Sequence, residues 1–104
     1  MTTGITVRDN TDAHTYDAAV DGKVVGTIVY ELEGRRTVFM HTIVEPEYRR
    51  RGIGTALARD ALDDVRAKGM TLTSYCGFVS GFIDAHPEYA DLIDAAHPGH
   101  TRRD

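Results

Sequence analysis

The sequence has no tryptophan and a single cysteine, Cys76, among its 104 residues. One cysteine cannot form an internal disulfide, and sparse cysteine is typical of proteins from reducing compartments. No apolar run approaches the roughly 20 residues that a membrane-spanning helix requires. The first residues show no basic-then-apolar targeting pattern. These absences predict a cytoplasmic protein without a membrane partner.

The chain also has no excess of positive charge. The chain has 16 acidic and 12 basic residues and a formal net charge of −4, which argues against a nucleic-acid partner. His97 and His100 lack companion ligands at metal spacing, so we predict no metal site. The length fits one domain. We expect this domain over residues 5–96 and a disordered polar tail at 97–104.

Alternating apolar residues predict four strands in the first half of the chain, at 5–8, 14–20, 23–32 and 35–44. Asp21-Gly22 is a strong hairpin signal between the second and third strands, so these strands form an antiparallel meander. Strict alternation along the third strand places Val24, Ile28, Tyr30 and Leu32 on one face, and Val25, Thr27 and Val29 on the other. In the fourth it places Val38, Met40, Thr42 and Val44 opposite Phe39, His41 and Ile43.

The hydrophobic period changes to that of a helix from Thr55, with Gly69 as its end signal. The apolar face of this helix comprises Leu57, Ala58, Ala61, Leu62 and Val65. A fifth strand is predicted at 70–75, a helix at 77–86 and a short last helix at 88–96. A strand–helix–strand succession implies a right-handed crossover, so the fifth strand should run parallel to the fourth. The fold class is therefore α/β (α+β), with a C-terminal helix after the mixed sheet.

The segment between the fourth strand and the first helix carries the strongest functional signal, Arg49-Arg50-Arg51-Gly52-Ile53-Gly54-Thr55. Glycines at a helix start leave backbone N–H groups unshielded, and the helix dipole favours an anion there. Adjacent arginines favour phosphate over a lone carboxylate. No Gly-Lys-Ser/Thr occurs, which excludes the NTPase loop, and Leu57 replaces the third glycine of the dinucleotide fingerprint.

What remains is Arg49-x-x-Gly52-x-Gly54, which resembles the pyrophosphate-binding signature [Q/R]-x-x-G-x-[G/A] of the GNAT superfamily of acetyl-coenzyme A-dependent N-acetyltransferases. The resemblance extends over most of the chain, roughly from Arg8 to Ile93. Its motifs in order are His41-Thr42-x-Val44-x-Pro46, Arg51-Gly-Ile-Gly54, Cys76-x-Phe78-Val79 and His86-Pro87-Glu88-Tyr89. Together they are similar to the minimal, single-domain branch of that superfamily.

The resemblance implies a reduced GNAT fold without the helical insertion that usually follows the first strand. Coenzyme A, the implied cofactor, would lie where the fourth and fifth strands splay apart. The residues implied to bind it are Ile43, Val44, Glu45, Arg49, Arg50, Arg51, Gly52, Ile53, Gly54, Thr55 and Phe78. The acceptor would be a small-molecule or peptide amine, and its identity is left open because the insertion normally helps build the acceptor pocket. The protein would be a monomer or a weak homodimer.

His41 and Cys76 are the candidate catalytic residues, because each lies on a strand that would flank the thioester. Histidine has an ordinary pKa of about 6.5 and suits a general base. Cys76 would protonate the leaving sulfur or carry the acetyl group itself. Packed structural roles remain open for both residues, since a single cysteine is often a buried apolar side chain.

Three functions are compatible with these observations. The first is an acetyl-coenzyme A-dependent N-acetyltransferase. The second is a module that binds coenzyme A or senses acyl groups with little turnover. The third is an interaction domain in which the arginines 49–51 meet an acidic partner.

Overall fold

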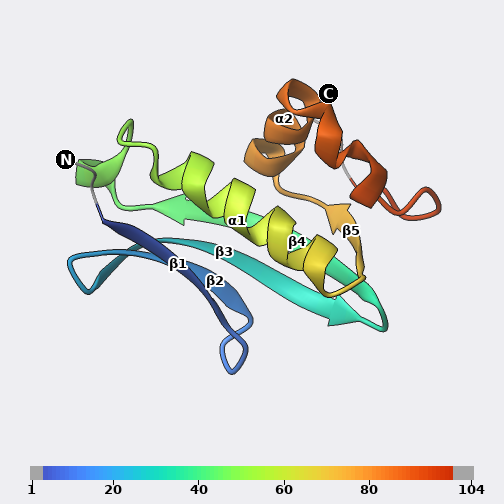
Figure 1. Cartoon of the computed structure of the whole chain (residues 1–104), viewed down its shortest axis with the longest axis horizontal. Helices are drawn as coiled ribbons and strands as arrows, with labels where there is room; N and C mark the ends of the chain where they lie inside the picture. Colours follow the sequence, from blue (N-terminus) through green and yellow to red (C-terminus); the bar gives the residue numbers. More distant parts are fainter. Residues whose placement is uncertain (1–3, 100–104) are drawn as a thin grey trace.

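The structure, a computed structural model, describes residues 4–99. Within these residues, five strands form one sheet in the order β1-β2-β3-β4-β5, together with two α-helices and two 3₁₀ helices. The strands are β1 (Ile5–Asn10), β2 (Thr15–Val20), β3 (Lys23–Glu33), β4 (Arg36–Val44) and β5 (Thr71–Ser74). The helices are η1 (Pro46–Tyr48), α1 (Ile53–Ala67), α2 (Gly77–Ala85) and η2 (Pro87–Leu92). Figure 1 shows α1 lying along the sheet and α2 beside it.

The predicted fold class is confirmed by the sheet topology. β1 to β4 pair antiparallel in succession, and β4 pairs with β5 in parallel from Arg36↔Thr71 to Phe39↔Ser74. The β2–β3 turn has positive φ at Asp21 (52°) and Gly22 (81°), the combination that a tight hairpin turn needs. Within residues 4–99, no helix is long and apolar enough to cross a membrane.

The predicted faces of β3 are wrong at Val24 and Val25, because a bulge interrupts the alternation there. Ala18 pairs with Gly26 but Ala19 pairs with Val24, so Val25 is an extra residue in the ladder. Val25 therefore points into the core with Ile28 and Tyr30, while Val24 and Leu32 are exposed. A bulge shifts the register by one residue, and a one-residue shift exchanges the two faces of everything beyond it.

The apolar face of α1 is confirmed and forms the centre of the core against the sheet. Its five predicted apolar residues are fully buried, and Ile53 extends the buried stripe one turn earlier. The helix ends as predicted at Gly69, which has a φ of 68°. Gly69 N donates to Arg66 O, and Met70 N donates to Val65 O, at 3.0 and 3.1 Å. This pair of bonds satisfies the last carbonyls of α1 in a Schellman motif.

A polar network fixes the C-terminal half of α1 to three strands. The Tyr16 hydroxyl donates to Asp64 Oδ2 at 2.7 Å, and Lys68 Nζ lies 2.8 Å from the same oxygen. Lys68 also donates to Asp9, which accepts from the Tyr30 hydroxyl at 2.6 Å. Burial and the hydrogen bond to Asp64 raise the pKa of Tyr16 well above its usual range. Burial acts to raise the pKa of Asp64, but hydrogen bonds from Lys68 and Tyr16 outweigh it and lower that pKa.

The segment after η2 differs from the prediction of a helix at 88–96 and a disordered tail from 97. Asp94 N donates to Leu72 O at 2.8 Å, and Ser74 N donates to Pro98 O at 3.2 Å. Gly99 forms an isolated parallel bridge with Ser74. These bonds cover the edge of β5 that faces away from β4, so residues 97–99 belong to the folded domain. The remainder of the predicted tail, 100–104, lies outside the described residues.

Candidate active site

A cavity of about 520 Å³ lies where the second half of β4, the loop after it, the first turn of α1 and the start of α2 meet. Its walls are therefore built from the segments that carry the phosphate-loop and strand motifs of the sequence. The lining residues are Thr42, Ile43, Val44, Tyr48, Arg49, Arg50, Gly52, Ile53, Gly54, Thr55 and Phe78.

The cavity exists because β4 and β5 diverge after their last backbone pair. Their backbone pairing ends at Phe39↔Ser74, followed by one bond from Tyr75 N to Phe39 O at 2.8 Å. β4 continues to Val44, whereas the chain after Tyr75 turns at Cys76 into α2. From Met40 onward, the β4 edge that faces β5 therefore has no ladder partner in the described part of the chain.

A bulge in β4 decides which side chains face the cavity. Val29 pairs with His41 but Tyr30 pairs with Phe39, so Met40 is the extra residue. Thr42 then lies opposite the buried Ile28, on the face that α1 and α2 cover. His41 lies opposite Val29 on the other face and is exposed. The predicted faces of β4 are thus wrong beyond Met40, since Phe39 shares its face with Thr42 rather than with His41.

The loop before α1 holds backbone in a conformation suited to an anion. Gly52 precedes the helix with a φ of 82°, and Arg50 has a φ of 66°, which is rare for a residue with a side chain. The first intrahelical bond runs from Ala56 N to Gly52 O at 3.0 Å. The N–H groups of Ile53, Gly54 and Thr55 therefore precede the ladder of α1 and remain at its start, beside the cavity.

Phe78 closes the cavity on the side of α2. A Cβ placed on Gly54 would lie 2.8 Å from Cζ of Phe78, so the ring rests directly on the glycine backbone. Phe78 remains 47% exposed despite this contact, which leaves its other face available to a ligand. Gly54 thus permits both the close approach of the ring and access to the first turn of α1.

The three arginines do not act alike. Arg49 and Arg50 line the cavity, and Arg49 Nε donates to Val44 O at 3.3 Å. Arg51 instead places its guanidinium 5.3 Å from the centre of the Tyr48 ring. Arg51 therefore stacks beside the loop and does not line the cavity.

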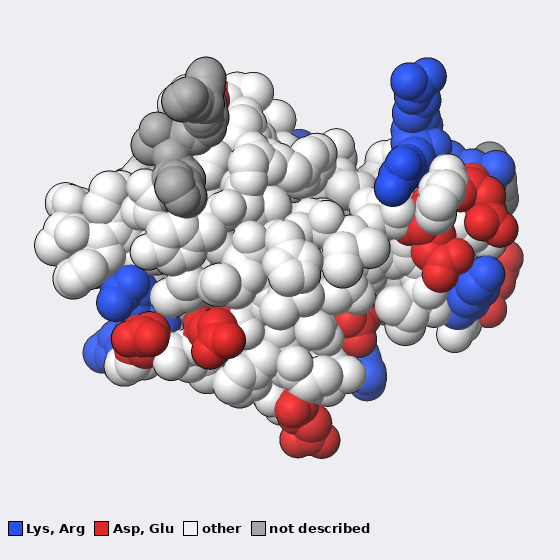
Figure 2. All heavy atoms as spheres, turned by 180° about the vertical axis from the view of Figure 1, so that it is seen from behind, with Lys and Arg blue, Asp and Glu red and all other residues white. Residues whose placement is uncertain are grey.

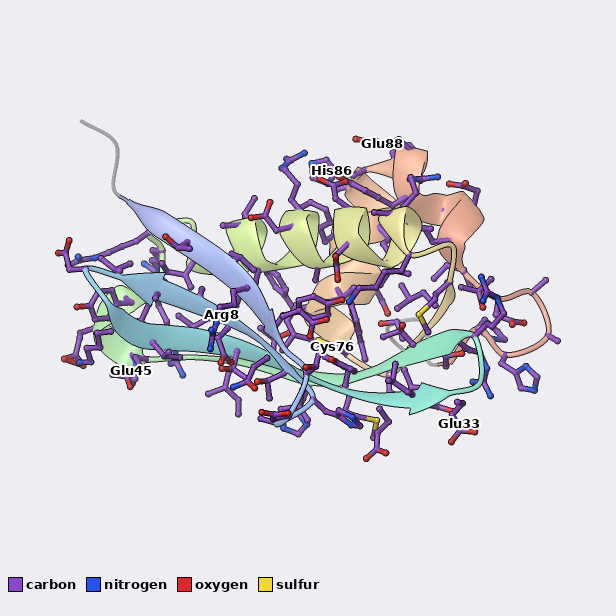
Figure 3. All side chains as sticks on the ribbon, turned by 60° about the horizontal axis from the view of Figure 1, so that its bottom comes forward. Arg8, Glu33, Glu45, Cys76, His86 and Glu88 are labelled. Atoms are coloured by element: carbon purple, nitrogen blue, oxygen red, sulfur yellow. The ribbon has the colours of Figure 1, made fainter. Side chains whose placement is uncertain are left out.

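Glu45 also lies outside the cavity lining. Its backbone N donates to Val25 O at 2.9 Å, and its carboxylate lies 3.8 Å from Lys23 Nζ. Figure 3 shows Glu45 at one end of the sheet and Cys76 near its middle. All the other residues predicted to bind the cofactor, Arg51 excepted, line the cavity.

Cys76 is held behind the cavity wall by Thr42. The thiol is buried, at 4% exposure, and Sγ lies 3.0 Å from Thr42 Oγ1. Cys76 is the N-cap residue of α2, and its carbonyl accepts from Ser74 Oγ and Ser80 N. These bonds fix the position of the thiol against β4. The structure therefore brings Cys76 to Thr42 and not to His41, its predicted partner.

Thr42 and Tyr48 line the cavity and were not predicted to do so. Thr42 stands inside the His-Thr-x-Val-x-Pro motif, but only the bulge at Met40 turns it inward. Across residues 4–99, no group of three or more His, Cys, Asp or Glu side chains is placed to hold a metal ion. The site therefore offers hydrogen-bonding, cationic and thiol groups for its chemistry.

Residues 15–92 match the family model described as GCN5-related N-acetyl-transferase. The chain belongs to this GCN5-related N-acetyltransferase family. The match spans β2 to η2 and includes the whole cavity lining. Acetyl transfer is the activity by which the family is defined.

Several solved structures share the fold. Ard1 from Thermoplasma volcanium matches with a TM-score of 0.54 and 27% identity over 62% of this chain and 45% of its own. An IAA acetyltransferase from Bacillus cereus has a TM-score of 0.50 and 31% identity over 58% and 41%. The PaiA N-acetyltransferase from Thermoplasma acidophilum, solved in complex with coenzyme A, has a TM-score of 0.55 and 21% identity over 71% and 48%.

This chain spans less than half the length of each of these three proteins. No curated protein matches the sequence. The likeness of the PaiA structure, at 21% identity, concerns the fold alone.

Proposed function

We propose that the protein transfers an acetyl group from acetyl-coenzyme A to an amine. The observation that carries the proposal is a single cavity that joins the unshielded amides before α1 to the unpaired edge of β4. Coenzyme A carries two groups that fit these two features. Its diphosphate fits the amides, and its amide-bearing pantetheine arm fits the strand edge. Within the family to which the chain belongs, this match favours coenzyme A over other phosphate compounds.

The loop suits the diphosphate. The N–H groups of Ile53, Gly54 and Thr55 and the positive end of the α1 dipole would bind its oxygens. Arg49 and Arg50 line the same end of the cavity and add two cations. Arg51 and Glu45 take no direct part in this proposal, since neither lines the cavity.

The unpaired edge of β4 suits the pantetheine arm. Ile43 and Val44 line the cavity beyond the last β4–β5 bond, where an extended ligand with amides can replace a strand. Phe78 would cover the arm from α2. The reactive end of the ligand would then lie toward Thr42, at the closed end of the splay.

The chemistry requires a neutral amine, polarisation of the thioester carbonyl and a proton for the leaving thiolate. Backbone N–H groups at the bulge of β4 are free of the β5 ladder and suit polarisation. Cys76 stands beside the closed end of the cavity as a source of the proton or as an acetyl carrier. His41 lies on the opposite face, so it serves as base only for an amine that arrives over that face.

Isothermal titration with coenzyme A tests the first step, and we expect a dissociation constant in the micromolar range. Binding no tighter than millimolar would count heavily against the proposal. Release of free thiol from acetyl-coenzyme A, measured with polyamines, lysine peptides and small amines, tests the transfer itself. Intact mass after exposure to acetyl-coenzyme A separates the roles of Cys76, because only a carrier gains a labile acetyl group.

A second function, binding of coenzyme A without turnover, is favoured by one observation. The sheet face opposite α1 and α2 is open, with Val24 at 49% and Ile43 at 56% exposure. Figure 2 views the molecule from behind and shows a broad surface with few charged side chains. Tight binding with background thiol release for every amine would support this second function.

A further inference from the structure

Thr42 occupies a position that the proposed reaction has not yet used. Its hydroxyl oxygen lies 3.0 Å from Cys76 Sγ. Thr42 also lines the cavity, whereas the buried Cys76 does not. The threonine therefore stands between the thiol and the space in which the thioester would lie. A proton that leaves Cys76 for the ligand has the Thr42 hydroxyl in its path.

We propose that Thr42 is a catalytic residue that passes a proton from Cys76 to the leaving sulfur of coenzyme A. The inference rests on the proposed acetyl transfer. It assigns to Thr42 the direct contact with the substrate and makes Cys76 the proton source behind it.

The position of Thr42 along the cavity supports contact with the reactive end of the ligand. The other lining residues of β4, Ile43 and Val44, lie farther from the last β4–β5 bond at Phe39. Arg49, Arg50 and the first turn of α1 also line the cavity, and they belong to the segment proposed to bind the diphosphate. A ligand with its diphosphate at α1 therefore presents its other end to Thr42.

A hydroxyl is suited to this task because it donates one hydrogen bond while it accepts another. In the starting state the Cys76 thiol donates to Thr42 Oγ1, and the Thr42 O–H points into the cavity. The 3.0 Å separation allows either atom to be the donor. This orientation needs no movement of either side chain, only rotation of two hydrogens.

The proton count closes without another reactant. The amine nitrogen forms the bond to the acetyl carbon, the carbon–sulfur bond breaks, and its electron pair goes to sulfur. The Thr42 hydroxyl proton moves to that sulfur, and the Cys76 thiol proton moves to Thr42 Oγ1. The attacking amine nitrogen loses its extra proton to water as the amide forms, and a proton from water in the cavity returns to the Cys76 thiolate through the Thr42 hydroxyl. The products are the acetylated amine and free coenzyme A thiol.

Thr42→Val tests the relay, because valine keeps the shape of threonine and removes only the hydroxyl. We expect kcat to fall about 100-fold, the lower end of what general acid catalysis contributes, with coenzyme A affinity unchanged within threefold. Thr42→Ser restores a hydroxyl and should recover most of kcat. If Thr42→Val is poorly folded by circular dichroism, Thr42→Ala and Thr42→Ser form the comparison instead.

Thr37→Val is the matched control. Thr37 lies on the same strand, is buried and donates its hydroxyl to the sulfur of Met70 at 3.7 Å. It does not line the cavity. The control also removes a threonine hydroxyl that is hydrogen-bonded to a sulfur atom, but outside the cavity, and it should leave kcat unchanged.

A double variant decides whether Thr42 and Cys76 act as one unit. If they form a relay, Cys76→Ala combined with Thr42→Val should lose no more kcat than the worse single variant, because groups in series are not additive. Multiplied losses, or a wild-type kcat in Thr42→Val, would overturn the relay while the transferase survives. Wild-type protein that binds coenzyme A but releases no thiol with any amine would overturn both transfer and relay. Absence of binding would instead remove the proposed function at its first step.

Discussion

The two ends of α1 are held by different means. At the C-terminal end, side chains bind one another, with Asp64 and Lys68 linked to Tyr16, Tyr30 and Asp9. At the N-terminal end, the first amides face the cavity and Gly52 provides no side chain to cap them. One end is saturated with internal hydrogen bonds, and the other keeps donors available. This difference predicts that changes at one end affect stability and changes at the other affect coenzyme A binding.

The largest expected effect is at the N-terminal end. Gly54→Trp would fill the space beside Phe78, where even a Cβ on residue 54 lies 2.8 Å from the ring. We expect affinity for coenzyme A to fall at least 100-fold, about 2.7 kcal/mol, in isothermal titration. Gly81→Trp is the control, because nothing lies within 4 Å of a Cβ at Gly81 on α2. Unchanged affinity in Gly54→Trp would mean that the diphosphate does not bind there.

The second effect is at the C-terminal end. Asp64→Ala leaves the Tyr16 hydroxyl and one Lys68 bond without their acceptor. We expect the free energy of unfolding in urea to fall by about 2 kcal/mol, the usual cost of an unsatisfied buried group, with coenzyme A affinity unchanged. Asp60→Ala, at an exposed position one turn earlier on α1, should change stability by less than about 0.5 kcal/mol. An equal loss in both variants would contradict a specific role for the network.

The third effect is a pH dependence of stability, and it also arises at the C-terminal end of α1. Burial and Asp64 raise the pKa of Tyr16, so the folded protein holds the phenol proton more tightly than the unfolded chain does. The stabilisation is complete below the ordinary tyrosine pKa of about 10 and is lost as pH rises above it. Tyr16→Phe should cost about 1 kcal/mol at neutral pH and show a shallower loss of stability above pH 10.

The control for that pH dependence is Tyr75→Phe, at an exposed position outside the network. Urea unfolding between pH 7 and 11 measures both variants. Identical slopes for wild type and Tyr16→Phe would show that Tyr16 is not the group responsible. Lys68 would then be the other candidate, because its hydrogen bonds to Asp64 and Asp9 raise its pKa and it also loses its proton at high pH.

The smallest effect is at Arg50, where one substitution should change stability and coenzyme A affinity in opposite directions. Arg50 has a φ of 66°, a conformation that glycine adopts without strain. Arg50→Gly should raise the free energy of unfolding by about 0.5 kcal/mol and lower coenzyme A affinity a few-fold, because a cavity-lining cation is lost. Asp21→Gly in the β2–β3 turn, with a φ of 52°, should gain stability alone. An affinity loss in Asp21→Gly would contradict the assignment of the cavity.

The local parts of the site were predictable. Glycines 52 and 54 beside three arginines at a helix start predict an anion site from sequence alone, and both glycines line the cavity of the structure. The order of strands and the parallel β4–β5 pair also followed from periodicity and crossover handedness. These features depend on neighbours within a few residues, so the sequence contains their causes.

The end of the cavity beside Cys76 was not predictable in the same way. His41 and Cys76 were predicted to flank one thioester from neighbouring strands, but the extra residue at Met40 turns Thr42 inward and His41 outward. Residues 97–99 carry only polar and turn-forming side chains, yet their backbone pairs with β5. Both outcomes depend on which backbone groups a neighbouring strand offers.

The sequence by itself determined the glycine-containing loop before α1, the apolar face of α1 and the succession of elements, because each follows from short-range geometry. Only the tertiary structure decided which side of β4 faces the cavity and which residue meets Cys76. A bulge is stabilised by the packing of the strands on either side of it, and a shift of one residue exchanges the two faces. No local pattern in the sequence records that shift.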